Sequence, residues 1–225
     1  MNKVNLIQTG LTNYNDIWNL QKYYFQKVTE NRDCNYLIFT EHKPVITIGK
    51  SGGDENIVAN RQYLKDQGIA VVEIDRGGDI TYHGPGQIVV YPILNLLEFK
   101  KDIHWYLRSL EEIVIQTLIE FAIPAQRIKG LTGVWVGDKK ICAIGIKVTR
   151  WVSMHGIALN VSPDLNYFNY IIPCGIKGKG VTSIFEQIGN IIPVNHVILK
   201  LIEKFEQILQ VKVVFEKFNG ITENN

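Results

Sequence analysis

Apolar residues recur along this chain with two different periods, and each period predicts a kind of secondary structure. The clearest helical pattern begins after Asp102, which can cap a helix, and repeats an apolar position every three or four residues as far as Phe121. Amphipathic or apolar helical spacing predicts helices over 14–29, 61–67, 102–121 and 194–209. Short β-branched and apolar runs predict strands over 4–8, 36–40, 45–48, 70–74, 88–94, 133–136, 140–148 and 154–161.

The order of these elements predicts the fold class. Strands and helices come in runs and do not alternate regularly, which favours an α+β fold with a mainly antiparallel or mixed sheet packed by helices. The turn residues 41–44 are expected to join strands 36–40 and 45–48 as a pair. No linker or repeat divides the sequence, so residues 1–225 are expected to form one domain, and the last residues look frayed.

Composition and charge narrow the classes of function. The chain is 46% hydrophobic and 20% charged with a net charge of +2, which gives no indication of nucleic-acid or membrane binding. The longest uncharged run, 84–97, contains two prolines and is too short to span a bilayer. Residues 1–10 contain no apolar stretch of signal-peptide length, and the three cysteines form no CxxC pair. We therefore expect a soluble protein of the reducing cytoplasm.

Several common motifs are incomplete in this sequence. Gly49-Lys50-Ser51 resembles the end of a phosphate loop, but Pro44 stands where that loop needs a glycine. The five histidines show no HExxH or zinc-ligand spacing, and no GxSxG segment presents a serine nucleophile. These absences exclude the commonest kinds of nucleotide site, metalloprotease site and serine-hydrolase site.

The segment 76–87 has the most unusual composition. Its glycines and proline flank a short polar strand directly before the buried strand at Ile88. Glycines allow backbone N–H groups to approach a ligand closely, and alternation places Thr81 and His83 on one face of the strand. A turn-rich hairpin without a ligand would explain the same composition.

Of the three cysteines, Cys174 is the best candidate for a reactive thiol. It lies between Pro173 and Gly175, which predicts an accessible loop position. Cys142 shares strand parity with apolar residues and is expected in the core, whereas Cys34 follows Asp33, whose charge disfavours a thiolate. An inert, partly buried thiol remains the ordinary alternative for Cys174.

The strand around Cys142 carries a lysine on its apolar face. Lys140 is either a residue at the strand end that extends its amine to solvent or a residue held for chemistry. Small residues occupy one face of this strand (Ala143, Gly145) and of the next (Gly156, Ala158), which leaves room for a slender apolar ligand if the faces meet. Strict alternation places Lys140 opposite Ala143, so a bulge or strong twist is needed if both are to line one site.

Together these segments resemble the lipoyl(octanoyl) transferases of lipoate biosynthesis. The resemblance rests on 76–87, on 133–145, on 155–161, on Asp164-Leu165, on Pro173-Cys174-Gly175 and on 181–184, in order and at matching spacing. It covers most of the chain as far as about residue 185. Two positions depart from the family pattern. Lys50 stands where an arginine is usual, and Thr149 occupies a position that is frequently basic.

The resemblance implies a biotin/lipoate protein ligase-like fold and a role for each matching position. Cys174 would carry the acyl group as a thioester, and Lys140, 34 residues earlier (140 to 174), would favour its thiolate. His155 is a further auxiliary candidate. The acyl site would be lined by Arg76, Gly77, Gly78, Asp79, Ile80, Thr81, Tyr82, His83, Ala143, Ile144, Gly145, Gly156, Ile157 and Ala158.

The implied reaction moves an octanoyl group from acyl carrier protein to a lysine of a lipoyl domain. The acceptors would be the E2 subunits of 2-oxoacid dehydrogenases and the H protein of glycine cleavage, and no cofactor or metal is expected. Two alternatives stay open: an ATP-dependent lipoate or biotin ligase on the same fold, and a non-catalytic module that binds acyl carriers. The ligase alternative is disfavoured by Arg76-Gly-Gly-Asp79, where lipoate ligases carry an Arg-Arg-x-x-Gly-Gly-Gly type of loop.

Overall fold

The structure is a computed structural model that describes residues 2–32, 34–172 and 179–216. The helices are α1 (Tyr14–Asn31), α2 (Arg61–Asp66), α3 (Ile103–Ile119), α4 (Ile184–Ile188) and α5 (Val194–Leu209), with 3-10 turns at Asp54–Asn56, Leu96–Glu98 and Leu165–Tyr170. The strands are β1 (Asn2–Thr12), β2 (Tyr36–His42), β3 (Val45–Ile48), β4 (Ala70–Glu73), β5 (Ile80–His83), β6 (Gln87–Ile93), β7 (Val134–Val136), β8 (Lys139–Thr149), β9 (Val152–Asn160), β10 (Gly180–Val181) and β11 (Val211–Phe215).

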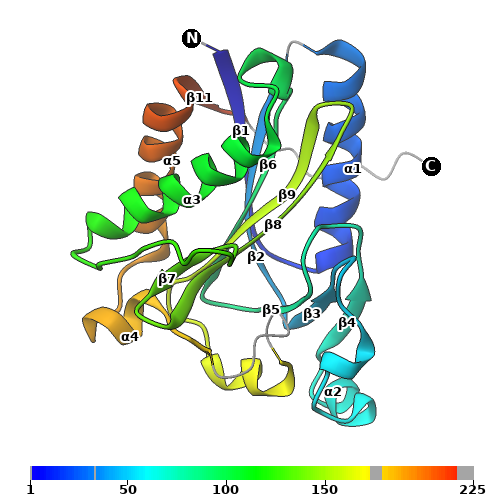
Figure 1. Ribbon diagram of the computed structural model, residues 1–225. Helices are drawn as coiled ribbons and strands as arrows, with labels where there is room; N and C mark the ends of the chain where they lie inside the picture. Colours follow the sequence, from blue (N-terminus) through cyan, green and yellow to red (C-terminus); the bar gives the residue numbers. More distant parts are fainter. Residues whose placement is uncertain (1, 33, 173–178, 217–225) are drawn as a thin grey trace.

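The described strands form one large and one small sheet (Figure 1). The large sheet has the order β10-β8-β9-β6-β2-β1-β11, and β7 pairs with β8 beside this path. Its central strands β2, β6, β9 and β8 pair antiparallel, whereas β1, β10 and β11 join through parallel pairs. The expectation of an α+β fold with a mixed sheet is confirmed.

Helices cover the two faces of the large sheet differently. On one face α3 and α5 pack together over a core that includes Phe39, Val90 and Leu159. On the other face α1 packs over a smaller core that includes Val89 and Tyr91. Figure 1 shows α1 on one side of the sheet and α3 with α5 on the other. Cover on both faces explains why every residue of β6 and β9, and all but one of β2, is buried.

The small sheet, with the order β4-β3-β5, stands beside the first turns of α1 (Figure 1). β3 pairs antiparallel with β5 and parallel with β4. One side of this sheet has its own core, in which Ile46 and Tyr82 pack with Phe168. The opposite side of β5 carries Thr81 and His83, so this sheet can present polar groups toward the large sheet.

The expected helices lie within two residues of the observed ones at each end. The Asp102 side chain caps α3 by accepting a hydrogen bond from the Trp105 N–H at 3.0 Å, as its position predicted. α5 occupies the residues that its apolar spacing predicted.

The pairing of strands 36–40 and 45–48 is wrong, because β2 and β3 belong to different sheets. The residue before a proline prefers an extended backbone, so Lys43-Pro44 carries the chain onward instead of reversing it. The Lys43 N–H bonds the Thr12 carbonyl of β1, which also leaves no hairpin between the two strands. Strand β11 was not expected from the sequence; it pairs in parallel with β1.

Candidate active site

A cavity of about 370 Å³ lies between the α1 face of the large sheet and the inner side of β5. Its floor is made where β8 and β9 pair: Ala143 lies opposite Ala158, and Gly145 lies opposite Gly156. Ala158 in turn pairs with Val89 of β6, which continues the floor. The two small-residue faces therefore meet, as the strand pattern required for a slender ligand.

Lys140 reaches the same cavity through a bulge in β8. Val134 of β7 pairs with Cys142, but the next residue, Trp135, pairs with Lys140, so Ile141 is an extra residue on β8. Ile141 and Cys142 consequently both enter the core under α3, and the alternation of the strand shifts by one position. Lys140 and Ala143 then line one cavity. The bulge that the sequence required is confirmed.

The surroundings of Lys140 hold its side chain in place. Only 8% of Lys140 is exposed, and its ammonium lies 4.8 Å from the centre of the Trp135 ring. Gly133 lies tightly against the backbone of β8: a Cβ at this position would lie 2.6 Å from the Cys142 carbonyl O, and in ordinary contact with Lys140 Cε at 3.6 Å. Gly133 also has a φ of +109°, a conformation that favours glycine.

Residues 74–79 form the Arg76 loop between β4 and β5. This loop closes another side of the cavity and joins the two sheets. Arg76 donates from Nη2 to the Thr47 carbonyl at 3.0 Å and to Thr47 Oγ1 at 3.1 Å, both on β3. The Gly77 N–H bonds the Ile146 carbonyl of β8 at 2.9 Å. This loop therefore brings a buried guanidinium to the cavity while it spans from the small sheet to the large one.

Asp75 anchors the beginning of this loop to the large sheet. Its Oδ1 lies 2.8 Å from His155 Nε2, and its Oδ2 accepts a bond from Lys147 Nζ. Burial opposes ionisation of Asp75, but the hydrogen bonds from Lys147 and His155 outweigh it and hold the pKa of Asp75 below its usual value. Burial lowers the pKa of His155. A neutral His155 beside a carboxylate must carry its proton on Nε2.

A chain of hydrogen bonds determines the tautomer of His83. The Thr182 carbonyl can only accept, so Asn160 turns Nδ2 toward it at 2.9 Å and Oδ1 toward Gln87 Nε2, also at 2.9 Å. Gln87 then presents Oε1 to His83 Nδ1 at 2.7 Å, which makes Nδ1 the donor. Burial lowers the pKa of His83 to about 3, so the ring is neutral at neutral pH. Its Nε2 accepts from Thr47 Oγ1 at 3.4 Å, the same hydroxyl that receives Arg76.

Most of the site residues expected from the sequence surround this one cavity. The lining includes Arg76, Gly78, Asp79, Ile80, Thr81, His83, Lys140, Ala143, Ile144, Gly145, His155, Gly156, Ile157 and Ala158. Ile144 and Ile157 belong mainly to the core under α3 and α5. Among the described residues, Gly77 and Tyr82 are not part of the lining: Gly77 is bonded to Ile146, and Tyr82 stacks on Tyr167 with ring centres 4.9 Å apart. Cys174 lies outside the described residues.

Several residues of the cavity were not expected from the sequence. Tyr14 comes from the first turn of α1 and Tyr91 from β6, and the loop 130–132 lies beside Lys140. Tyr91 has the same strand parity as Val89, which is a signal that could have found it; Tyr14 and the loop carry no local signal. Cys142 is fully buried, and burial raises the pKa of its thiol, in agreement with its expected place in the core.

Two other features are absent from the part of the chain that the structure describes. Residues 2–32, 34–172 and 179–216 contain no group of three or more His, Cys, Asp or Glu side chains arranged to hold a metal ion. In the same ranges no helix combines the length and the apolar character needed to cross a membrane.

Known structures share this fold. The lipoate protein ligase of an archaeal lipoylation system from Thermoplasma acidophilum superimposes with a TM-score of 0.75 at 18% identity, covering 98% of this chain and 87% of that one. The biotin protein ligase from Aquifex aeolicus, in complex with biotin and ATP, gives a TM-score of 0.55 at 16% identity and covers 92% of this chain and 70% of that one. At these identities the likeness concerns the fold alone.

Sequence relatives are much closer. The octanoyltransferase of Flavobacterium johnsoniae is 50% identical over 203 residues, covering 83% of this chain and 88% of the relative. The octanoyltransferase of Caldanaerobacter subterraneus subsp. tengcongensis is 45% identical over 213 residues, with 94% and 92% covered. Residues 13–206 match the family described as the lipoyl protein ligase A/B catalytic domain. This chain therefore belongs to the lipoyl protein ligase A/B catalytic domain family and, within it, to the octanoyltransferases.

Proposed function

We propose that this enzyme transfers an octanoyl group from a carrier thioester to a protein lysine through a thioester on Cys174, with Lys140 as its partner. The observation that carries the proposal is the β8 bulge. It places the buried side chain of Lys140 in the wall of a cavity whose floor is narrow and apolar. The chain that follows the Cys174 segment also returns to this lysine: Val181 of β10 pairs with Lys140. Both sheets contribute to the cavity, which supports treating residues 1–225 as one catalytic domain.

The first step forms the acyl-enzyme. A free thiol is only a few per cent thiolate at pH 7, and a nearby ammonium favours the ionised form. The Cys174 thiolate attacks the carbonyl carbon of the donor thioester, and a tetrahedral oxyanion forms. Its collapse breaks the bond to the carrier's sulfur, and the Lys140 ammonium gives that thiolate a proton. The octanoyl group is then bound to Cys174, and Lys140 is left as a neutral amine.

The second step transfers the acyl group to the acceptor. The lysine amine of the acceptor attacks the Cys174 thioester, and Lys140, now neutral, takes the proton that the attacking nitrogen loses. The Cys174 thiolate leaves, so the products are an amide on the acceptor and the original thiolate–ammonium pair. The reaction consumes no ATP because the thioester is already activated, and the proposal requires neither a metal nor another cofactor.

The cavity suits the hydrocarbon part of this substrate. Ala143, Ala158 and Val89 form a continuous apolar floor, which the paired glycines Gly145 and Gly156 extend. Each methylene group buried there contributes about 0.8 kcal/mol to binding. We assign this floor to the octanoyl chain.

The polar side of the cavity suits the carbonyl group. Arg76 lies against Gly145 at one end of the floor, and Gly78 and Asp79 line the cavity with it. We assign to this loop the stabilisation of the tetrahedral oxyanions, for which the loss of one donor typically costs about 3 kcal/mol. Arg76 is held by Thr47, so its orientation is set before the substrate binds.

The partners follow from the chemistry proposed. The donor is octanoyl-acyl carrier protein, and the acceptors are the lipoyl domains of 2-oxoacid dehydrogenase E2 subunits and of the glycine cleavage H protein. Relatives with the name octanoyltransferase, 44–50% identical to this chain, support an octanoyl donor. A thiolate nucleophile has to stay reduced, which supports a location in the cytoplasm.

The proposal is tested by intact-mass measurement after mixing the enzyme with octanoyl-acyl carrier protein. One octanoyl adduct is expected on the wild type and on the control variant Cys34→Ala, and none on Cys174→Ala, which should stay folded but inactive. Lys140→Ala should slow acylation and raise the pH at which Cys174 is half-alkylated. An active Cys174→Ala enzyme would rule out the covalent route. Turnover with free octanoate and ATP, but not with the carrier thioester, would instead identify a ligase.

A further inference from the structure

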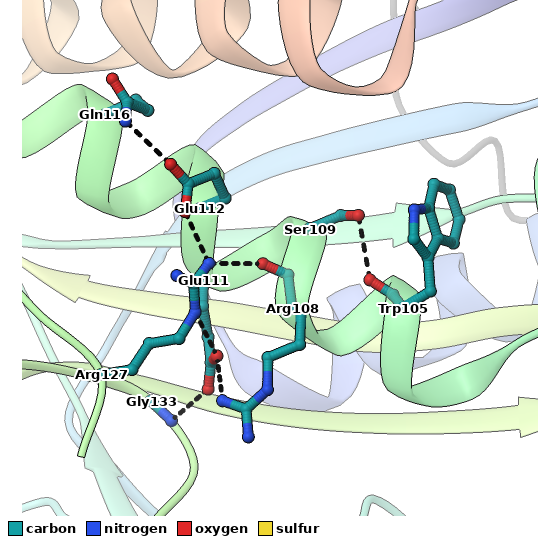
Figure 2. A network of polar contacts seen from close by, with 8 residues as sticks. All are labelled: Trp105, Arg108, Ser109, Glu111, Glu112, Gln116, Arg127 and Gly133. Carbon is teal, nitrogen blue, oxygen red and sulfur yellow. Dashed lines mark hydrogen bonds and ion pairs between the residues drawn. The ribbon is translucent and has the colours of Figure 1, made fainter. Parts of the chain in front are cut away.

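A buried carboxylate that the proposed reaction does not use lies on the far side of the large sheet from the cavity. Glu111 belongs to α3, and its side chain is 0% exposed. A buried charge is tolerated only when other groups bond it, and Glu111 has three such donors. Arg108 and Arg127 bond its Oε2, at 2.6 and 3.0 Å, and the Gly133 N–H bonds its Oε1 at 3.2 Å (Figure 2).

The bond to Gly133 connects Glu111 with the cavity. Gly133 ends the segment that follows α3 and directly precedes β7, and residues Gly130, Leu131 and Thr132 line the cavity beside Lys140. Figure 2 shows the Glu111 side chain extending from the helix toward Gly133 and Arg127. The carboxylate therefore ties the last residue of this segment to a helix whose position is set by the core.

Gly133 also contacts the bulge that turns Lys140 inward. Its Cα faces the Cys142 carbonyl so closely that a Cβ would lie 2.6 Å from that oxygen, and the same Cβ would be 3.6 Å from Lys140 Cε. The residue after it, Val134, forms the last regular pair with β8 before the extra residue Ile141. A displacement of Gly133 would change both the register at the bulge and the space that the lysine stem occupies.

We propose that Glu111 is a positioning residue, which by holding the Gly133 N–H fixes the cavity wall at residues 130–133 against Lys140. The inference rests on the function proposed for Lys140. A purely structural role for Glu111 would require only its pairing with the two arginines. Glu111 also bonds the Gly133 N–H next to the bulge, and through this bond it affects the position of Lys140 and hence the reaction.

The neighbouring residue supplies a matched control. Glu112 also pairs with Arg127, at 2.7 Å, and bonds Gln116, but no hydrogen bond to Gly133 is recorded for it among the described residues. Glu112→Gln thus weakens the same arginine network without touching the tie to Gly133. Glu111→Gln replaces one of the two acceptor oxygens with an NH2 group, which cannot accept. The side chain can then no longer bond both arginines and the Gly133 N–H.

The experiment measures the pH dependence of Cys174 alkylation in the full chain, with acylation rates and thermal unfolding recorded in parallel. Glu111→Gln is expected to raise the pH of half-alkylation by about half a unit, and so to lower acylation at pH 7 by up to about threefold. Glu112→Gln should keep the wild-type alkylation profile. Glu111→Asp, which retains the charge but is one methylene shorter, should shift the profile in the same direction if Glu111→Gln does not fold.

Two outcomes overturn the inference, and they are distinguishable. If the Glu111 variants unfold at a lower temperature but keep the wild-type alkylation profile and acylation rate, Glu111 is only structural. If Lys140→Ala itself leaves the alkylation profile unchanged, the proposed role of Lys140 fails, and the inference fails with it whatever the Glu111 variants do. A shift in Lys140→Ala and the Glu111 variants, without a shift in Glu112→Gln, supports the inference.

Discussion

Gly145→Ala tests whether the Arg76 loop has to lie directly against β8. A Cβ on Gly145 would lie 2.8 Å from the Gly77 carbonyl O and 2.9 Å from Arg76 Cδ. Ordinary van der Waals contact begins at 3.4 Å, so the Gly77 carbonyl would have to move from 2.8 to 3.4 Å, by about 0.6 Å. The Gly77 N–H is bonded to Ile146 of the same strand, which resists that movement.

The displacement should affect both stability and catalysis. Overpacking of this kind costs about 1–3 kcal/mol, partly offset by the roughly 0.4–1 kcal/mol that replacing a glycine gains through the unfolded chain. We expect a net loss of about 1–2 kcal/mol in the free energy of unfolding. Because a misplacement of about 1 Å in an active site can cost about a hundredfold in rate, we expect roughly a tenfold fall in kcat/KM for octanoyl transfer.

The assay combines urea unfolding with octanoyl transfer kinetics, and Gly180→Ala is the matched control. Gly180 lies in β10 of the same sheet, and the three heavy atoms nearest to a Cβ there belong to the Lys139 side chain, in ordinary contact at 3.4–3.9 Å. This variant should stay within about 0.5 kcal/mol of the wild type with unchanged kinetics. If Gly145→Ala behaves like Gly180→Ala in both measurements, the close approach of the Arg76 loop to β8 has no importance for the site.

Two further predictions concern the floor of the cavity and its histidines. Ala143→Val adds two methyl groups opposite Ala158. At about 0.8 kcal/mol for each methylene displaced, the KM for octanoyl carrier should rise roughly tenfold, while the KM for hexanoyl carrier should change little. An equal rise of both KM values would contradict the assignment of the floor to the octanoyl chain. Burial lowers the pKa of His42 to about 4 and that of His83 to about 3. Below pH 6.5 the unfolded chain therefore binds more protons than the folded chain. The free energy of unfolding should fall as the pH falls below 6.5, by up to about 1.4 kcal/mol per pH unit for each histidine. Urea unfolding at pH 7, 6 and 5 should show a smaller acid loss for His83→Gln than for the exposed control His104→Gln, and equal slopes would refute the cause given.

Local patterns predicted most of the elements, because helix and strand periodicity are properties of short windows. The residues that α3 and α5 bury toward the sheet are the ones that recur at helical spacing, and Asp102 carries its capping function within four residues. Pairing between strands is not local. β11 was not expected, since its partner, β1, lies at the other end of the chain.

The hairpin expected around Pro44 failed for a related reason. A turn-like tetrapeptide between two strands does not show whether the chain reverses or continues into another sheet. The partners of β3 come from residues 70–73 and 80–83, and only their assembly makes the second sheet. That sheet places Thr81 and His83 opposite the floor of the cavity.

The sequence by itself determined the family of this protein, its element types and most of the positions that surround the cavity, because these depend on composition and spacing along the chain. Tertiary structure decided how those positions meet. The side on which Lys140 projects depends on one extra residue at a bulge, and that bulge depends on β7 and on a glycine held by Glu111 from a helix on the other face of the sheet. Packing between segments that are distant in the chain sets these relations, so no local pattern of residues records them.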